Sequence, residues 1–113
     1  MPELDRPTRP VPRPLPSLLS GENADVYFLR TERVLAGEGR NPVVTMEVFC
    51  RRAGATLCGI DEAKGLLSLA LEADAAAGTA AVWALKDGDL IDAKEVVLRI
   101  RAPYRSIARF ETA

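Results

Sequence analysis

Residues 79–104, TAAVWALKDGDLIDAKEVVLRIRAPY, contain the pattern that decides the fold. Two runs of mostly apolar residues flank the turn signal KDGD at residues 86–89, which predicts two strands and a turn. In the second run the side chains alternate, and one side is formed by Val96, Leu98 and Ile100. The other side carries Val97, Arg99 and Arg101. We therefore expect a half-buried strand, with a ladder that Pro103 ends.

Two helices and another strand are predicted upstream. The clearest helix covers residues 59–78, GIDEAKGLLSLALEADAAAG, because apolar residues recur there at helical spacing. Its apolar face, formed by Ala63, Leu66, Leu67 and Ala70, is expected to pack on a sheet. Residues 41–52, NPVVTMEVFCRR, predict a strand, and residues 20–39 predict a helix between cap-type residues and two glycines. The pattern indicates an α+β domain with a small, mostly antiparallel sheet and two packed helices.

The two ends of the chain have a different character. Residues 1–16 hold six of the eight prolines, so we predict an extended or disordered tail over residues 1–19 and a domain over residues 20–113. Alternatively, RPVPRPLP at residues 9–16 is a polyproline-like ligand for a partner domain. The last segment, SIARFETA, begins a further helix for which we expect no partner within the chain.

The composition excludes several kinds of function. Histidine is absent, so this chain has no imidazole base, no histidine metal ligand and no phosphohistidine. Fifteen basic and sixteen acidic residues give a net charge of −1, which provides no electrostatic case for nucleic acid or an anionic membrane. No apolar run reaches the length of a membrane span and no secretory signal is present, so we expect a cytoplasmic protein.

Each of the remaining polar motifs can have either a structural or a functional role. Cys50 and Cys58 lack companions at zinc-like spacing, so we expect two reduced thiols and no metal site, with a disulfide as the alternative. The acidic pair Asp61-Glu62 favours capping of a helix over acid–base catalysis. Four arginines form either a solvated face or an anion-binding face: Arg99, Arg101, Arg105 and Arg109.

ADVYFLRT, residues 24–31, offers the best candidate site. Wound as a helix, this stretch places Phe28 on a broad apolar face and Tyr27 on the opposite face, together with Arg30 and Thr31. Tyr27 is therefore either a simple rim residue or a ring offered to a planar ligand or a neighbouring subunit. In the second case Arg30 is available for an anionic group.

Five strings occur in an order that resembles the N-terminal domain of nicotinate phosphoribosyltransferases, above all the shorter archaeal and bacterial type. They are ADVYFLRT, VVTMEVF, CGIDEAKGLL, VWALKDGDLI and RFETA, and the likeness runs from about Ser20 to Ala113. The resemblance implies the hammerhead or sandwich-like N-terminal domain of type II phosphoribosyltransferases. In the family an irregular α/β barrel follows, with the phosphoribosyl pyrophosphate site and a histidine that ATP phosphorylates.

The resemblance also implies a reaction, a partner and a site. The family couples nicotinate with phosphoribosyl pyrophosphate in NAD salvage, with ATP and Mg²⁺ expected for the full-length enzyme and no cofactor held by this chain. The family's active site forms across a dimer, so we expect a homodimer or a separate barrel chain. The tyrosine matching Tyr27 stacks there on the pyridine ring, and Arg30 and Thr31 are implied as phosphate or carboxylate contacts.

The chain resembles an N-terminal fragment or a split gene product, because no barrel and no histidine are present. We expect no catalytic residue in it and no activity from it alone. The segment DGDLIDAKEVVLRI also resembles the hammerhead fold of biotin and lipoyl carrier domains, and the equivalent domain of quinolinate phosphoribosyltransferases. A non-catalytic binding or carrier-type module is thus the alternative, although Lys86 precedes the turn instead of occupying its apex.

Overall fold

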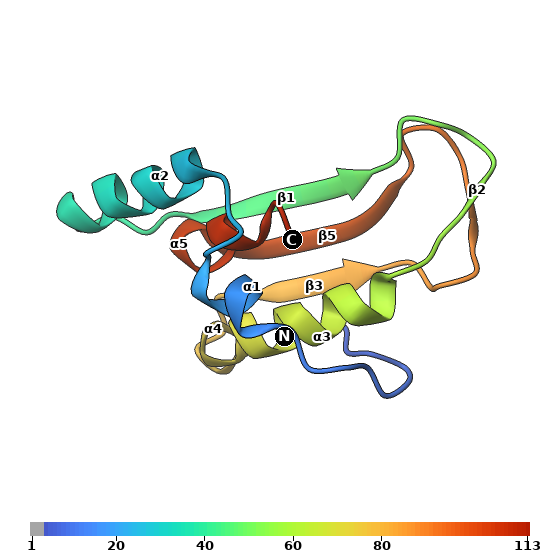
Figure 1. Cartoon of the computed structure of the whole chain (residues 1–113), viewed down its shortest axis with the longest axis horizontal. Helices are drawn as coiled ribbons and strands as arrows, with labels where there is room; N and C mark the ends of the chain where they lie inside the picture. The colour runs from blue at the N-terminus through green and yellow to red at the C-terminus, as the bar shows by residue number, and fades with distance from the viewer. Residues whose placement is uncertain (1–3) are drawn as a thin grey trace.

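The central sheet has three antiparallel strands in the order β1-β5-β3 (Figure 1). This computed structural model describes residues 4–113, with β1 at Val43–Phe49, β3 at Ala81–Ala84 and β5 at Val96–Pro103. β5 is the middle strand, since its Ile100 pairs with Met46 of β1 on one side and Val82 of β3 on the other. The predicted α+β class with a small antiparallel sheet is confirmed.

A second, two-stranded sheet is formed by β2 (Ala55–Thr56) and β4 (Leu90–Ile91). The sequence predicted only two strands over residues 79–104, and β4 is the one that was missed. The turn itself lies where it was predicted, because Gly88 has a φ of 96° and the Asp89 amide donates to the Lys86 carbonyl at 3.1 Å. After this turn the chain pairs with β2 before it returns as β5 (Figure 1).

The long predicted helix is two helices, α3 (Ile60–Ala70) and α4 (Glu72–Ala76). The break is at Leu71, where φ is −112° and the side chain is completely buried. The fully buried positions of α3 are Ile60, Asp61, Lys64 and Leu67. Of the predicted apolar face only Leu67 is fully buried, while the others are half-buried. A charged lysine thus lies on the packed face, and its partner comes from the N-terminal segment described below.

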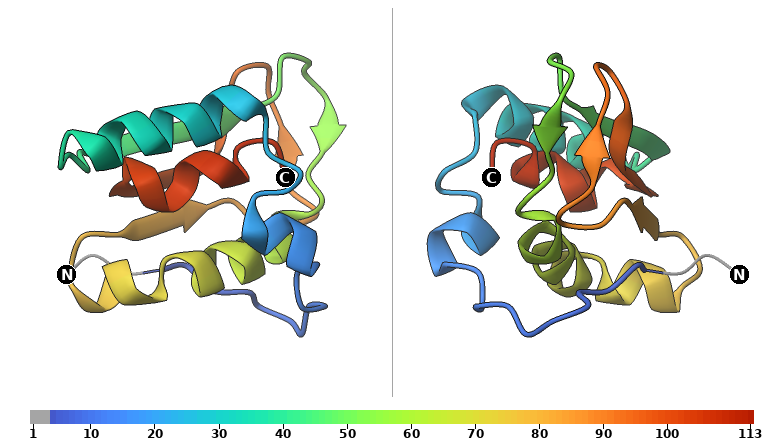
Figure 2. Two further views of the ribbon diagram at one scale, coloured as in Figure 1. Left: turned by 60° about the vertical axis from the view of Figure 1, so that its left-hand side comes forward. Right: turned by 90° about the vertical axis from the view of Figure 1, so that its right-hand side faces the viewer.

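The C-terminal segment has a partner within the chain, contrary to the prediction. It forms α5 (Tyr104–Ile107) and the short 3-10 helix η1 (Ala108–Phe110), and the Ile107 and Ala108 side chains are buried. The helix α2 (Val26–Gly37) packs on these two elements (Figure 2, left). The tertiary contact missed in the sequence therefore fixes the position of α2.

The core lies between one face of the sheet and the helices. Its members include Leu67 and Leu71 from the α3 region, Leu98 and Ile100 from β5, and Ile107 from α5. The opposite sheet face is open, and a row of side chains crosses it from Glu47 through Arg99 to Trp83. The Arg99 Nε donates to the Glu47 carboxylate at 2.9 Å, a cross-strand pair of opposite charges.

A β-bulge corrects the predicted alternation in β5. The register between β1 and β5 shifts at Val48/Phe49, because Val48 pairs with Leu98 and Phe49 pairs with Val96. Val97 is left without a partner on β1, and it is 4% exposed although it was assigned to the arginine side. An extra residue in one strand bends that strand locally, which explains why the neighbours Val97 and Leu98 are both buried.

The N-terminal segment is in contact with the domain. Residues 4–13, called here the N-terminal strap, form a parallel bridge from Leu4 to Val82, and the Asp5 amide donates to the Val82 carbonyl at 3.1 Å. Leu4 is 6% exposed and joins the core. A short helix, α1 (Pro16–Ser20), follows the strap. Residues 4–13 of the predicted tail are therefore extended and docked, whereas residues 16–19 are helical. The expectation for residues 1–3 lies outside the described residues, and the boundary at residue 20 stays a prediction.

Candidate functional site

The helix α2 presents the face on which the sequence placed Tyr27. Asp25 occupies the N-cap position and its amide donates to the Thr112 hydroxyl at 3.2 Å, so the helix begins directly before the aromatic pair. Tyr27 is 55% exposed, whereas Phe28 is half-buried. The helical phase assigned to these two neighbours agrees with their exposure, and Tyr27 lies on the outward face.

The inward face of α2 is held by one ion pair and a few half-buried apolar side chains. Arg109 of η1 donates to both carboxylate oxygens of Glu32, at 3.3 and 2.9 Å, and to the Ser20 carbonyl at 3.3 Å. Phe28, Leu29 and Leu35 contribute partial burial, and no residue of α2 is completely buried. The helix is thus attached along one side and open along the other.

The Tyr27 ring is supported by its neighbour. The ring centroids of Tyr27 and Phe28 are 4.3 Å apart, with an angle of 38° between the planes, so the phenol rests against a ring that is itself half-buried. Partial desolvation, together with the negative charges of Glu111 and Asp25, raises the pKa of the Tyr27 hydroxyl above its usual value of 10.0. The phenol is therefore neutral at physiological pH, and its remaining ring face is available for stacking.

Arg30 and Thr31 share this side of the helix, and their hydrogen-bonding capacities differ. Arg30 is exposed and makes no ion pair within residues 4–113, so its guanidinium can bind an anion. The Thr31 hydroxyl donates to the Tyr27 carbonyl at 2.8 Å. Because the hydroxyl proton is used in this hydrogen bond, Thr31 can only accept a hydrogen bond from a ligand unless the bond to Tyr27 breaks.

A polar cluster that sequence reasoning missed lies at the beginning of α3. Asp87, from the KDGD turn, accepts hydrogen bonds from the amides of Ile60 and Asp61 at 2.8 and 3.0 Å, so it caps a helix whose own N-cap residue is Gly59. The predicted capping function thus belongs to Asp87. Asp61 is 4% exposed and instead accepts hydrogen bonds from the strap.

Strap residues supply the partners of this cluster. The Thr8 amide donates to Asp61 at 3.0 Å, and the Arg9 guanidinium contacts Asp61 at 3.1 Å and Asp87 at 3.4 Å. The Lys64 ammonium, on a side chain that is 2% exposed, pairs with Asp5 at 3.0 Å. The only local signal in the sequence was the charged residue Lys64 within an otherwise apolar helical face.

Hydrogen bonds to the charged forms shift both aspartates in the same direction. The Thr8 amide, followed by its hydroxyl and the positive charge of Arg9, lowers the pKa of Asp61 despite its burial. The two amides at the beginning of α3 lower the pKa of Asp87 in the same way. Both groups are therefore anionic at neutral pH, which suits a structural role better than proton transfer.

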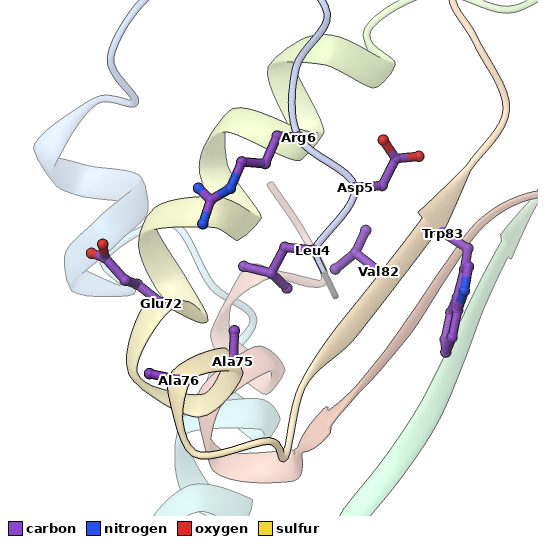
Figure 3. Close-up of a pocket in the computed structure, with 8 residues that line it drawn as sticks. All are labelled: Leu4, Asp5, Arg6, Glu72, Ala75, Ala76, Val82 and Trp83. Carbon is purple, nitrogen blue, oxygen red and sulfur yellow. The ribbon is translucent and has the colours of Figure 1, made fainter. Parts of the chain in front are cut away.

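A groove of about 830 Å³ opens where the strap crosses β3 (Figure 3). Leu4 and Val82 lie side by side there, with Arg6 from the strap and Glu72 from α4 among the other lining residues. Trp83 also lines the groove, but its ring points away from the Leu4–Val82 pair (Figure 3). The walls carry charges of both signs, so the groove has no clear preference for an anion or a cation. None of the predicted site residues lines it.

The structure also bears on the two cysteines, on metal binding and on membrane insertion. Cys50 and Cys58 are both exposed free thiols. Residues 4–113 contain no group of three or more cysteine, aspartate or glutamate residues that could hold a metal ion. Over the same residues, no helix combines the length and the apolar character needed to cross a membrane.

Comparison with known proteins places the chain in a protein family. Residues 25–113 match the family described as "Quinolinate phosphoribosyl transferase, N-terminal domain". The chain belongs to this family. The match begins at the N-cap of α2 and therefore includes Tyr27, the sheet and the C-terminal helices, but not the strap.

A solved structure supports membership of the quinolinate phosphoribosyl transferase N-terminal domain family. The chain is similar to nicotinate-nucleotide pyrophosphorylase from Pyrococcus furiosus, with 26% sequence identity and a TM-score of 0.73 over 94% of this chain. It spans 26% of the length of that protein. A search of curated proteins found no match. The resemblance to an N-terminal domain of a phosphoribosyltransferase is thus confirmed, and so is the fold. The family that matches is the quinolinate one, and the nicotinate phosphoribosyltransferase family in particular stays a prediction.

Proposed function

We propose that this chain is the N-terminal portion of a nicotinate phosphoribosyltransferase, in which Tyr27 stacks on the substrate's pyridine ring in a neighbouring subunit. The reaction joins nicotinate to phosphoribosyl pyrophosphate and yields nicotinate mononucleotide and pyrophosphate, as a step of NAD salvage. The observation that carries the proposal is the outward, ring-supported position of Tyr27 on a helix with one open side.

Ring stacking is the physical basis of this role. An aromatic face binds a flat heterocycle through dispersion and quadrupole attraction, and a tyrosine loses little conformational entropy because it has two side-chain torsions. Since Phe28 already supports the Tyr27 ring, less ordering remains to be done when a ligand binds. Only 26% of the length of the similar solved protein is represented here, so the rest of the site must come from other residues.

Arg30 is proposed to select the negative charge of the substrate. One exposed guanidinium next to the ring suits a single carboxylate, as in nicotinate, better than the two carboxylates of quinolinate. Thr31 is proposed as a weaker contact that accepts a hydrogen bond, given the bond that its hydroxyl donates to Tyr27. The partner is proposed to be a second subunit or a separate barrel chain, in the cytoplasm.

ATP and Mg²⁺ are assigned to the barrel part of the full-length enzyme. The described residues hold no group of three or more metal-ligating side chains, and we propose that this chain binds neither ATP nor Mg²⁺ by itself. We therefore derive no step of the reaction through either group. The contribution of this chain is binding and orientation of the pyridine, and the chain alone is proposed to be inactive.

The coding sequence after the codon for Ala113 provides the first test. An open frame that encodes a barrel with a histidine supports the proposal. A stop codon without a nearby barrel gene favours the non-catalytic carrier-type alternative.

Activity provides the second test. The barrel-containing protein, or this chain combined with its barrel chain, is assayed with nicotinate, quinolinate and nicotinamide. Mononucleotide formation from nicotinate is expected. Turnover of quinolinate alone would replace the proposed substrate, and turnover by this chain without a barrel would contradict its proposed inactivity.

A further inference from the structure

Three arginines surround a second groove that the proposed function does not use. This groove, of about 410 Å³, lies where the end of the strap, α1, the end of α3 and the α5–η1 segment meet. Arg13, Arg105 and Arg109 provide its charges, and Leu19, Leu69 and Phe110 provide apolar walls. It therefore combines positive charge with an apolar surface.

The three guanidiniums are not equally free. Arg109 is held by both carboxylate oxygens of Glu32 and by the Ser20 carbonyl, so its charge is compensated and its position is fixed. Arg13 and Arg105 are exposed and make no ion pair within the part of the chain that the structure describes. No acidic residue lines the groove, which leaves two uncompensated positive charges there.

The four arginines that could form an anion-binding face according to the sequence lie in two separate places in the structure. Arg99 is paired with Glu47 on the open sheet face, and Arg101 belongs to that same face. Arg105 and Arg109 lie apart from them and meet Arg13, which the sequence had placed in the proline-rich tail. The candidate anion-binding surface is thus the groove formed by several separate elements, and not the arginine side of β5.

Size and surface indicate the class of ligand. Small-molecule sites enclose roughly 300 to 1,000 Å³ and are mostly apolar with a few polar groups, and this groove is at the lower end of that range. Leu69 is 49% exposed although it is a large apolar side chain, and Ser106 lines the same groove. A ligand with a small apolar body would cover Leu69, and its anionic group would contact the arginines.

We propose that this groove binds a small organic anion, a carboxylate or phosphate carried on an apolar ring. Arg105 and Arg13 donate hydrogen bonds to the anionic group, and the apolar body rests against Leu69 and Phe110. Arg109 does not provide free charge and acts as a fixed wall, because Glu32 already occupies its guanidinium.

Titration of the 113-residue chain with four probes tests this proposal. Benzoate and phenyl phosphate carry both the charge and the ring, inorganic phosphate carries the charge alone, and benzyl alcohol carries the ring alone. We expect saturable shifts of the Ser106, Arg109 and Ala70 backbone amide resonances with the first two probes, and affinities at least about tenfold lower for the other two. Affinity is expected to fall as salt is raised. Equal affinities for all four probes, or linear shifts without saturation, would overturn the proposal.

Matched substitutions identify the groups responsible. Arg105→Gln and Arg13→Gln are each expected to reduce benzoate affinity by roughly tenfold, which is typical for the loss of one charge-assisted hydrogen bond. Arg101→Gln removes an exposed arginine outside the groove and should leave the affinity unchanged. Unshifted core amides, such as those of Ile100 and Ala102, verify that each variant is folded. Retained binding in the Arg13→Gln, Arg105→Gln double variant contradicts the proposal, whereas the role of Tyr27 is unaffected by either result.

Discussion

The Arg109 guanidinium of η1 donates two hydrogen bonds, at 2.9 and 3.3 Å, to the carboxylate of Glu32 in α2. These residues are separated by 77 positions in the chain, and the Glu32 side chain is only 13% exposed. Because no residue of α2 is completely buried, this pair is the best-defined attachment of the helix that carries Tyr27.

Glu32→Gln should therefore loosen α2 without unfolding the domain. The amide keeps one acceptor oxygen but loses the charge, and removal of one partner from such a pair costs on the order of 1–3 kcal/mol. We expect faster amide hydrogen exchange across residues 28–37, with slow exchange retained in β5. Glu38→Gln, an exposed residue that follows the same helix, is the matched control. Unchanged exchange in α2 would mean that its apolar contacts alone hold it.

Tyr27→Ala is expected to separate binding from stability. The side chain is 55% exposed, so we expect the melting temperature of this chain to change by no more than about 2 °C. In the barrel-containing enzyme the same change should raise the KM for nicotinate. Tyr27→Phe keeps the ring and should preserve most of the affinity. A large fall in melting temperature with an unchanged KM would identify Tyr27 as a packing residue.

Asp61→Asn should release the strap. The substitution removes the charge that receives the Thr8 amide, the Thr8 hydroxyl and the Arg9 guanidinium. We expect a lower melting temperature and faster exchange of the Asp5 and Thr8 amides. Fluorescence provides an independent reading, because Trp83 is the single tryptophan and lines the groove where Leu4 and Asp5 cross β3. Glu62→Gln removes an adjacent but exposed carboxylate and is expected to change none of these signals.

Acid should remove the same stabilisation. Hydrogen bonding lowers the pKa of Asp61 and Asp87 in the folded chain below the ordinary value of 3.8, so near this pH the unfolded chain binds more protons than the folded one. Their contribution is complete above the ordinary pKa and is lost as pH falls through the lowered values. Denaturant unfolding at several pH values should therefore show a difference between wild type and Asp61→Asn that is constant above about pH 5 and shrinks in more acidic solution. A difference that grows on acidification would refute this linkage.

Gly65→Ala tests the close contact between the strap and α3. A Cβ atom at this position would lie 2.7 Å from Cγ2 of Val11, too close for a β-branched side chain that has few rotamers to choose from. Alanine favours helix over glycine by roughly 1 kcal/mol, so α3 itself should tolerate the change while strap protection falls. Adding Val11→Ala should restore the protection. If the single variant keeps full protection of the Thr8 amide, the contact relaxes freely.

The elements with a local signal were predictable. Residues 20–39 have cap-type residues, a helical apolar phase and two terminal glycines, and α2 lies within them at Val26–Gly37. The greater exposure of Tyr27 than of Phe28 followed from the same phase. The KDGD turn was also correctly located, since Gly88 supplies the positive φ that such a turn requires.

What the sequence could not provide depends on contacts between distant residues. Proline and charge made the N-terminal residues look unstructured, yet Leu4 is buried and Asp61 receives three hydrogen bonds from the strap residues Thr8 and Arg9 within 3.1 Å. The burial of Val97 depends on a register shift against β1, and the partner of α5 is α2. Local propensity contains no information about any of these pairings, because each is decided by tertiary packing.

The strap also sets an order of events during synthesis. Residues 4–9 leave the ribosome before residues 82 and 87 are made, so Arg9 must wait for Asp87, 78 positions later, and Leu4 must wait for Val82. Such non-local contacts form slowly, since the intervening chain has to close a long loop before any stabilisation is gained. The strap residues are thus translated before their partners and are among the last to reach their native place, and an interruption of translation before codon 87 would leave Arg9 without its acidic partner on the turn.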